Sequence, residues 1–284
     1  MLIDTHAHIH FHSFRFDREE AIRRTLKEGI SFIMPGTQID TSRAGVVLAE
    51  KLDNPKIYAS IGLHPIHINK NRADEDEVGP LEKFDTRGEE FDKEKYEELI
   101  TSPKVVAVGE VGLDYWRKPK SVAKKDEFVT RQKEAFKKQL DLALNYKKPL
   151  ILHCRVAHND MIEILNDHAI ISQLQNPGVV HSYTGDLDQL KKFLDMGFYI
   201  GVNGLVFTLP FVQDAVREAP LDRIVLETDS PYLLPPQVKN TKRNEPIFIK
   251  YIVEKIAEIK GMSFDRVQKQ TTENAQTLFG VEFE

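Results

Sequence analysis

The stretch Leu2-Ile3-Asp4-Thr5-His6-Ala7-His8 opens the chain with a short apolar run that leads directly into two histidines. The same order recurs, because several other β-like apolar runs also end at a residue of a type that binds metal ions. In a parallel barrel the carboxyl ends of all strands open onto one face, and enzymes of this architecture keep their chemistry there. Residues far apart in the sequence would then meet at one mouth, a pattern typical of a metal-dependent hydrolase. The candidates are His6, His8, Glu110, His153, His181 and Asp229, which follow the runs Leu2–Thr5, Val105–Val108, Pro149–Leu152, Val179–Val180 and Ile224–Thr228.

The β-like runs alternate with amphipathic helical stretches, which indicates βα units around a parallel sheet. Roughly eight such units fit a closed barrel better than an open doubly wound sheet. No G-x-G-x-x-G follows the first run, which disfavours a dinucleotide-binding fold. We therefore predict an α/β fold, a TIM-like (β/α)8 barrel that forms a single domain over residues 1–284, with the metal site at the C-terminal ends of the strands. The predicted strands are Leu2–Thr5, Phe32–Pro35, Ile57–Ile61, Val105–Glu110, Pro149–His153, Gly178–His181, Phe198–Gly201 and Arg223–Glu227, and the predicted helices are Arg18–Glu28, Asp40–Leu52 (capped by Asp40 or Thr41), Lys93–Ile100, Glu127–Tyr146, Met161–Ile171, Leu187–Met196, Phe211–Glu218, Ile247–Lys260 and Ser263–Leu278.

Composition sets the broad class of protein. Charged residues make up 29% and hydrophobic residues 41% of the chain, as expected of a soluble globular protein. The net charge of −5 excludes a generic surface for coating nucleic acid, although it leaves room for a phosphodiester that is gripped locally. No apolar stretch approaches the roughly 18 residues of a membrane span, and we expect no signal peptide because Met1 leads straight into the first strand. With one cysteine there is no internal disulfide, so we expect a cytoplasmic protein, with the nucleus as the alternative if the source is eukaryotic. We also expect no association with a membrane and no obligatory protein partner.

The candidate residues have the right chemistry to bind divalent cations. His6 and His8 are two apart, so in a strand both lie on one face and offer two neutral imidazoles. The two oxygens of Glu110 can bridge two ions. Ionisable groups that converge without a cation would each cost on the order of several kcal/mol through desolvation or repulsion, a cost that a bound ion removes. We expect divalent ions, two per chain, and the mixture of imidazole and carboxylate suits Zn²⁺ and tolerates Mn²⁺ or Mg²⁺.

Each candidate also has a simpler explanation. Taken alone, His153 or His181 is more often a hydrogen-bonded core histidine, and Asp229 is more often a helix cap or turn residue. Glu110 alone is more often a strand-end acid that pairs with a nearby cation. The long connection Pro65–Lys104 is either a solvated insertion around a crossover helix or a lid beside the site. The sequence does not separate these two alternatives.

Several motifs together resemble the TatD-type metal-dependent deoxyribonucleases, a family of amidohydrolase-like barrels. The resemblance runs in order along nearly the whole chain, although Val156 stands where the family has an acid and Tyr183 where it has phenylalanine. It implies that His6 and His8 bind one metal, His153 and His181 bind the other, and Glu110 bridges them. It further implies that Asp229 holds or deprotonates the attacking water and that the substrate is DNA, cleaved by 3′-to-5′ exonuclease action. The matching segments are Ile3-Asp4-Thr5-His6-Ala7-His8, Gly62-Leu63-His64-Pro65, Gly109-Glu110-Val111-Gly112-Leu113-Asp114-Tyr115, His153-Cys154-Arg155, Gly201-Val202-Asn203-Gly204, Leu226-Glu227-Thr228-Asp229-Ser230-Pro231-Tyr232, Arg243-Asn244-Glu245-Pro246 and Thr272-Glu273-Asn274-Ala275.

Five further residues are candidates for substrate binding. Arg155 can contact a phosphate or form an ion pair with an acid such as Asp160. His64 can bond a phosphate or leaving oxygen, or only cap the loop before Pro65. A base stacked on a rim aromatic contributes about 1–3 kcal/mol, but such a residue can equally pack against a barrel loop. The rim aromatics are Tyr115 and Trp116, and Arg243 is the candidate for contact with a DNA backbone.

Two other functions stay open on the same barrel. One is a small-molecule amidohydrolase such as a lactonase or a phosphotriesterase, since fold alone does not fix function. A carboxylated lysine would favour it, but Glu110 stands at the end of the fourth predicted strand. The other is an inactive scaffold, against which the complete set of ligands speaks. We expect a nuclease that prefers single-stranded or frayed 3′ ends.

Overall fold

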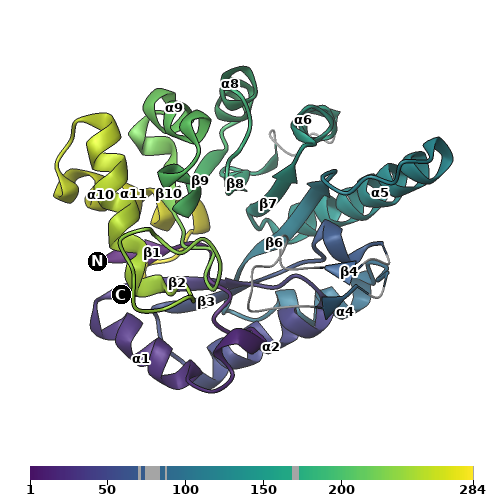
Figure 1. Ribbon diagram of the computed structural model, residues 1–284. Helices are drawn as coiled ribbons and strands as arrows, with labels where there is room; N and C mark the ends of the chain where they lie inside the picture. Colours follow the sequence, from purple (N-terminus) through teal and green to yellow (C-terminus); the bar gives the residue numbers. More distant parts are fainter. Residues whose placement is uncertain (70–71, 74–83, 87, 168–172, 284) are drawn as a thin grey trace.

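Eight parallel strands form a nearly closed barrel in a computed structural model of the chain, which describes residues 1–69, 72–73, 84–86, 88–167 and 173–283 (Figure 1). The first and last strands meet where the ring closes. There the backbone N–H of Thr5 donates to the carbonyl of Leu226 at 2.9 Å, and Ala7 pairs with Ser230 in a parallel bridge. The predicted TIM-like (β/α)8 barrel is confirmed. In their order around the barrel, the strands are β1 (Leu2–Asp4), β2 (Ile30–Pro35), β3 (Ile57–Ile61), β6 (Val105–Asp114), β7 (Leu150–Arg155), β8 (Gly178–His181), β9 (Tyr199–Val202) and β10 (Ile224–Leu226).

Helices alternate with these strands along the chain and cover the outside of the barrel (Figure 1). Each presents an apolar face to the strands, and in the helix Ile249–Lys260 this face includes Ile249, Ile252 and Ile256, at helical spacing. Gly261 ends that helix in the left-handed conformation, which glycine adopts without steric cost. The α-helices with described bounds are α1 (Arg18–Lys27), α2 (Ile39–Leu52), α4 (Lys93–Ile100), α5 (Val122–Tyr146), α6 (His158–Asp167), α8 (Leu187–Asp195), α9 (Pro210–Glu218), α10 (Ile249–Lys260) and α11 (Phe264–Phe279).

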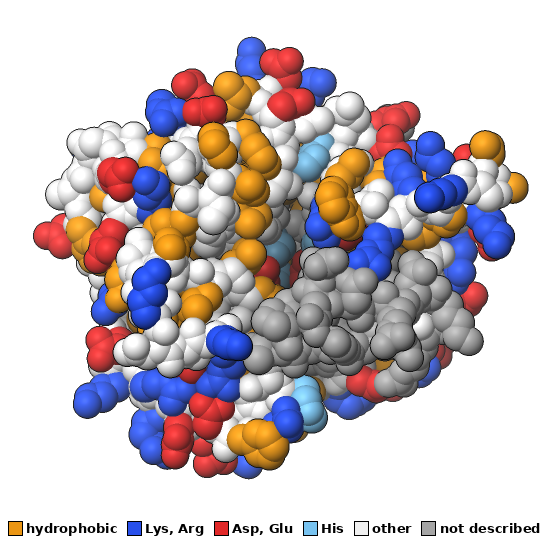
Figure 2. All heavy atoms as spheres, in the orientation of Figure 1, with side chains coloured by type: hydrophobic (Ala, Val, Ile, Leu, Met, Phe, Trp, Pro, Cys, Tyr) orange, Lys and Arg blue, Asp and Glu red, His pale blue; other side chains and the backbone are white. Residues whose placement is uncertain are grey.

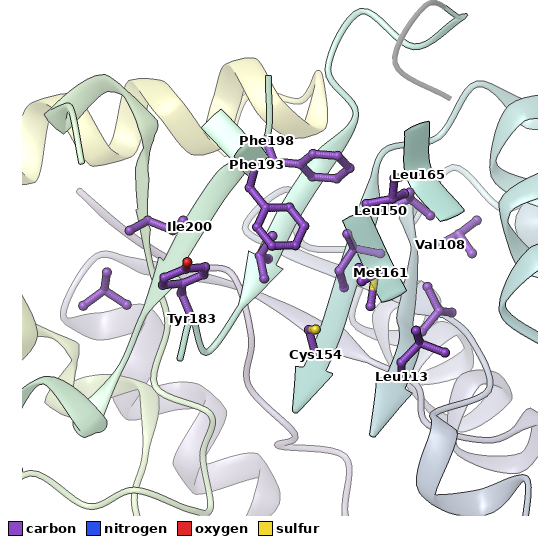
Figure 3. Packing of buried hydrophobic residues seen from close by; sticks show 14 of the residues in the cluster. Val108, Leu113, Leu150, Cys154, Met161, Leu165, Tyr183, Phe193, Phe198 and Ile200 are labelled. Carbon is purple, nitrogen blue, oxygen red and sulfur yellow. The ribbon is translucent and has the colours of Figure 1, made fainter. Parts of the chain in front are cut away.

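The main apolar core lies between the strands and the surrounding helices. Figure 3 shows the part of it where Met161 and Leu165 of α6 lie beside Leu150 of β7. Nearby, the rings of Phe193 and Phe198 meet edge to face, with centroids 6.1 Å apart. Burying one side chain of this size contributes roughly 1.5–3 kcal/mol, so this layer holds the helices against the strands.

A second apolar cluster lies near the beginnings of the strands. It includes Ile3, Ile151 and Val179, each the second residue of its strand, together with Phe279 and Phe283 from the end of the chain. The amino-terminal end of the barrel is therefore filled with apolar side chains. Buried polar residues such as His6, Glu110 and Glu227 gather at the other end instead.

The strand that carries Glu110 is longer than predicted. β6 continues to Asp114, and its pairing with β7 shifts register beside Glu110. Such a bulge re-aims a side chain and is common next to active sites. At Gly112, where φ is +146°, a Cβ would lie 2.1 Å from the carbonyl oxygen of His153, so a larger residue does not fit. The close pairing of β6 with β7 therefore depends on this glycine.

Some predicted helix boundaries were wrong. α5 begins at Val122 rather than at Glu127, and α6 begins at His158. Asp40 and Thr41 do not cap α2, because both lie inside its first turn; Thr41 Oγ1 instead accepts from the backbone N–H of Gln38 at 2.9 Å. The predicted end of the α6 helix lies outside the described residues, since it falls at Ile171.

The connection from Pro65 to Lys104 holds β4 (Arg72–Ala73) and β5 (Phe84–Asp85), which pair antiparallel, and the predicted helix α4. The acidic run Asp74–Glu77 lies outside the described residues. The structure therefore leaves both explanations of this connection, a solvated insertion and a lid, as predictions.

Within the described part of the chain, no helix has the length and hydropathy to cross a membrane.

A network of charged side chains joins α1 to the segment that follows β10. Both terminal nitrogens of Arg243 donate to the carboxylate of Asp17, at 2.7 and 2.6 Å, and Nη2 also donates to Glu245 at 2.8 Å. From α1, Arg24 donates to both oxygens of Glu245 at 2.6 and 2.7 Å. The hydrogen bond from Arg243 is the main cause that lowers the pKa of Asp17 to about 2. Arg243 therefore has a structural role in this network.

We expect Arg243→Ala to lower the free energy of unfolding by about 1–3 kcal/mol, because Asp17 and Glu245 lose charge-assisted hydrogen bonds. Urea unfolding followed by circular dichroism measures the effect. The difference from wild type should shrink as the pH falls from about 4, near the unfolded pKa of an aspartate, towards the folded pKa of Asp17, about 2. As the control, Arg217→Ala breaks an ion pair that is about half exposed on both sides, and should change stability by less than about 0.5 kcal/mol. Equal losses in the two variants would contradict the role assigned to Arg243.

Candidate metal centre

The six predicted ligands meet in one place, on the side of the barrel towards which the strands run, although Glu110 and His153 lie inside β6 and β7 rather than at their ends. Five of them line a cavity of about 950 Å³, which opens as a hollow with histidine and acidic side chains at its floor (Figure 2). The sixth, His6, is fully buried beneath the floor and stacks on the ring of His181, with centroids 3.5 Å apart. The five that line the cavity are His8, Glu110, His153, His181 and Asp229.

Glu110 lies between two groups of histidines. Its Oε2 is 3.3 Å from Nε2 of His6 and 3.9 Å from Nε2 of His8. Its Oε1 is 2.9 Å from Nδ1 of His153 and 3.8 Å from Nε2 of His181. Burial alone would raise the pKa of Glu110, but the surrounding histidines outweigh it and lower the pKa well below the usual range. The carboxylate is therefore charged and offers one oxygen to each group.

The first group has the spacing of ligands to one cation. Nε2 of His6 and Nε2 of His8 are 3.1 Å apart. Two nitrogens that bind one zinc-sized ion at about 2.0–2.1 Å lie about 3 Å from each other. Oδ1 of Asp229 is 3.6 Å from Nε2 of His8 and 3.8 Å from Nε2 of His6. Because burial lowers the pKa of His6 to about 4, its ring is neutral and the group fits a divalent cation.

In His8 and His181 the hydrogen bond is made by Nδ1, which leaves Nε2 to face a cation. Nδ1 of His8 is 3.1 Å from the carbonyl of Pro35, and Nδ1 of His181 is 2.9 Å from Oε2 of Glu227. Both partners only accept, so Nδ1 carries the hydrogen and Nε2 faces the centre. Burial would lower the pKa of His181, but Glu227 raises it to about 10, so a cation at Nε2 would release a proton.

His64 has the opposite arrangement. Its Nδ1 accepts from the backbone N–H of Ile66 at 3.0 Å, which leaves the hydrogen on Nε2. That nitrogen lies 3.3 Å from Oε1 of Glu110, as a donor to the carboxylate. His64 was predicted from the sequence as a contact for substrate or as a loop cap. The structure shows that it caps the loop, and it also brings it against Glu110 in the cavity.

A layer of acids behind the ligands was missed by the sequence reasoning. Glu227 accepts from His181, from the backbone N–H of Ser182 at 2.7 Å and from Asn203 at 3.0 Å. A Cβ at Gly201 would lie 2.2 Å from Oε2 of Glu227, so that glycine makes room for the carboxylate. Partners of this kind fix the orientation of a metal-binding histidine.

Two further acids belong to this layer. Asp4 is fully buried and accepts from the backbone N–H of Thr228 at 2.9 Å, which links the exits of β1 and β10. Asp114 lies 3.0 Å from Nε2 of His153. A local signal for these acids was available in the sequence. Asp4 stands two residues before the candidate ligand His6, and Glu227 stands two residues before the candidate ligand Asp229.

Asp229 has an unusual backbone. Its φ is +53°, in the left-handed region that residues other than glycine rarely adopt, and its N–H donates to the carbonyl of His6 at 2.9 Å. Burial would raise the pKa of Asp229, but the hydrogen bond with His8 and the nearby rings lower it. A charged carboxylate is thus held at the floor of the cavity, where it can accept a proton.

The other four candidates for substrate binding, besides His64, divide into two pairs. Arg155 and Trp116 line the cavity, with the guanidinium carbon of Arg155 4.4 Å from the centre of the indole ring. Asp160, the acid suggested for Arg155, instead accepts from Lys133 at 2.8 Å and from the hydroxyl of Tyr115 at 2.9 Å.

Neither Tyr115 nor Arg243 is among the residues that line the cavity. Tyr115 is buried and its hydroxyl donates to Asp160 in the first turn of α6, and Arg243 donates to Asp17 and Glu245. Sequence spacing does not reveal the partners of Arg243, because its bonds to Asp17 span 226 positions.

Comparison with known proteins matches the chain over its length. The model of the family described as TatD related DNase matches residues 3–280. The chain is 35% identical over 286 residues to the uncharacterized metal-dependent hydrolase YabD of Bacillus subtilis, covering 99% of this chain and 100% of that protein. It is 33% identical over 275 residues to the 3′-5′ ssDNA/RNA exonuclease TatD of Edwardsiella piscicida, covering 94% of each. The crystal structure of YJJV, a TatD homologue from Escherichia coli, superposes with a TM-score of 0.79 at 30% identity and covers 99% of this chain and 98% of that one.

We expect Glu110→Gln to lose most of the bound metal while the fold is retained, because one neutral amide replaces the carboxylate between both groups of histidines. Metal content after dialysis, measured by mass spectrometry, and urea unfolding test this. Glu94→Gln, on the exposed surface of α4, is the matched control and should keep the metal content of wild type. Full metal content in Glu110→Gln would contradict the central position of this residue.

Proposed function

This chain belongs to the TatD related DNase family of metal-dependent hydrolases, and from this premise we propose that it hydrolyses DNA phosphodiesters, removing nucleotides one at a time from single-stranded or frayed 3′ ends. The observation that carries the proposal is the position of Glu110, with one oxygen towards His6 and the other towards His153. A carboxylate in this position suits a site for two cations. The exonuclease name of the Edwardsiella relative supports a nucleic-acid substrate.

The shape of the site favours the end of a strand. A cavity of about 950 Å³ has the size of a pocket for a small ligand or a nucleotide rather than a trough that would hold a duplex. The overall charge of −5 also disfavours coating of long duplex DNA. An unpaired end that enters the cavity is the encounter that fits both observations.

In the proposed site, His6 and His8 hold one divalent cation, His153 and His181 hold a second, and Glu110 contributes to both. When bound, such ions lower the pKa of water and neutralise the charge that develops on phosphate oxygens. We propose that the ions are Zn²⁺, Mg²⁺ or Mn²⁺, since imidazole and carboxylate donors suit these metals.

The remaining residues handle the proton and the substrate. Asp229 orients the attacking water and accepts its proton, because its carboxylate is charged and lies at the floor of the cavity. Arg155, at the rim, presents its guanidinium to a phosphate. His64 donates to Glu110 and holds that carboxylate in place. We further propose that residues 1–284 act as one domain, because ligands come from both the first and the last strand.

A labelled-oligonucleotide assay tests the function. With a 5′-labelled single strand we expect a ladder that shortens by one nucleotide at a time, slower cleavage of a blunt duplex, loss of activity with a chelator and recovery with Mg²⁺ or Mn²⁺. An RNA strand of the same sequence, run in parallel, tests the preference for DNA. If no divalent metal supports cleavage and a lactone or phosphotriester is turned over instead, the chain is a small-molecule hydrolase. If nothing is turned over by the metal-loaded protein, it is an inactive scaffold.

We expect Asp229→Asn to lower kcat and kcat/KM together by about 10²–10⁴, because it removes a general base but keeps the size of the side chain. Binding of the oligonucleotide should stay within about twofold of wild type. Steady-state kinetics with separate binding measurements distinguish the two effects. A rise in KM alone would instead make Asp229 a contact for the substrate.

A further inference from the structure

A short segment beside the cavity has a charge opposite to that of the whole chain. Residues 115–125 read Tyr-Trp-Arg-Lys-Pro-Lys-Ser-Val-Ala-Lys-Lys, with five basic residues and no acid, in a chain of 39 basic and 44 acidic residues. The segment leads from the end of β6 into α5. We call its four lysines, Lys118, Lys120, Lys124 and Lys125, the basic ridge.

The basic ridge begins at the mouth of the cavity. Trp116 lines the cavity and is 57% exposed, with the guanidinium of Arg155 stacked on its ring. Two residues further, Nζ of Lys118 lies 3.8 Å from the centre of the Tyr115 ring. Figure 2 shows lysine and arginine side chains gathered beside the hollow, over α5 as placed in Figure 1. The exposed ring of Trp116 thus lies at the cavity, and the lysines follow it along the segment that leads into α5.

The positive charges of the basic ridge lie close enough to repel one another. Burial is the main cause that lowers the pKa of Lys118, and repulsion from Lys125 and Lys133 lowers it further. Among the described residues, Lys120, Lys124 and Lys125 are exposed and have no acidic partner within ion-pair distance. Concentrated positive charge of this kind favours the approach of a polyanion, which releases counterions as it binds.

We propose that the basic ridge binds the sugar–phosphate backbone of single-stranded nucleic acid next to the end that enters the cavity, with Trp116 stacked on a base between the two. An aromatic platform combined with a cationic track is the combination that binds single strands without regard to sequence. This inference rests on the proposed function, because it takes the cavity as the place where the strand is cut. It adds the direction in which the uncut strand leaves the cavity.

Two matched double variants test the ridge. Lys124→Glu/Lys125→Glu changes the ridge, whereas Lys137→Glu/Lys138→Glu changes an equally exposed pair about 20 Å further along the same helix, with the same change in net charge. Fluorescence anisotropy with a labelled single strand of about 10 nucleotides, in chelator and over a range of salt, measures binding. We expect the ridge variant to bind about 10-fold more weakly and the slope of log affinity against log salt to fall by about 1.4, since each lost phosphate contact removes about 0.7.

The control pair should bind within about twofold of wild type. Trp116→Ala should weaken binding about 10-fold and leave the salt slope unchanged, because stacking is not ionic. No binding by wild type, or equal weakening in the two double variants, would overturn the proposal. Binding of the ridge to vesicles rich in phosphatidylserine, without binding to the oligonucleotide, would also overturn it and would assign the ridge to a membrane.

Cleavage separates this inference from the proposed function. The ridge variant should hydrolyse a dinucleotide at the rate of wild type, because a dinucleotide reaches only the cavity, but should lose efficiency on the longer strand. If wild type binds the strand through the ridge and cleaves neither substrate, the proposed function fails while the ridge stands. If wild type cleaves both and the ridge variant matches it on both, the ridge alone fails.

Discussion

Backbone hydrogen bonds between the exits of β1 and β10 hold the candidate site together. Thr5 donates to Leu226, and Asp229 donates to the carbonyl of His6, so the first and last strands of the barrel are joined where their polar residues begin. In an open sheet these two strands would lie at opposite edges, and the ligands that they carry would not meet. Several polar side chains at these exits are buried, among them Asp4, His6 and Glu227, and a buried polar group without a partner costs free energy. The acids behind the ligands, such as Glu227, satisfy that requirement.

The architecture was predictable because buried parallel strands read as continuous apolar runs between amphipathic helices. The convergence of the candidate ligands followed from the same pattern, since a polar residue near the end of such a run lies towards the mouth of the barrel. Boundaries were less predictable. The bulge that places Glu110 inside β6 depends on the fit between two strands, and the early start of α5 leaves Val122 exposed, so hydrophobic periodicity does not reveal it.

The parts of the site that were missed depend on contacts across the fold. The hydrogen-bond partner of Nδ1 decides whether Nε2 of a histidine carries a hydrogen or is available to a cation. For His181 this partner is Glu227, which lies 46 residues away in the sequence. Likewise Arg243 looks like a free cation in the sequence, yet Asp17 and Glu245 hold it on both sides. Local spacing records which residue types are present, but it does not record which of them are already engaged.

The joining of the first and last strands has a consequence for the order in which the protein is made. During synthesis the ribosome releases His6 and His8 early and Asp229 only after all eight strands of the described barrel have emerged, because Asp229 follows β10, the last of them. A nascent chain therefore carries the candidate ligands His6 and His8 before the strand that closes the barrel beside them has been made. The candidate site is therefore complete only after β10 has been made, and a chain shortened before β10 would lack both Asp229 and the strand that closes the barrel.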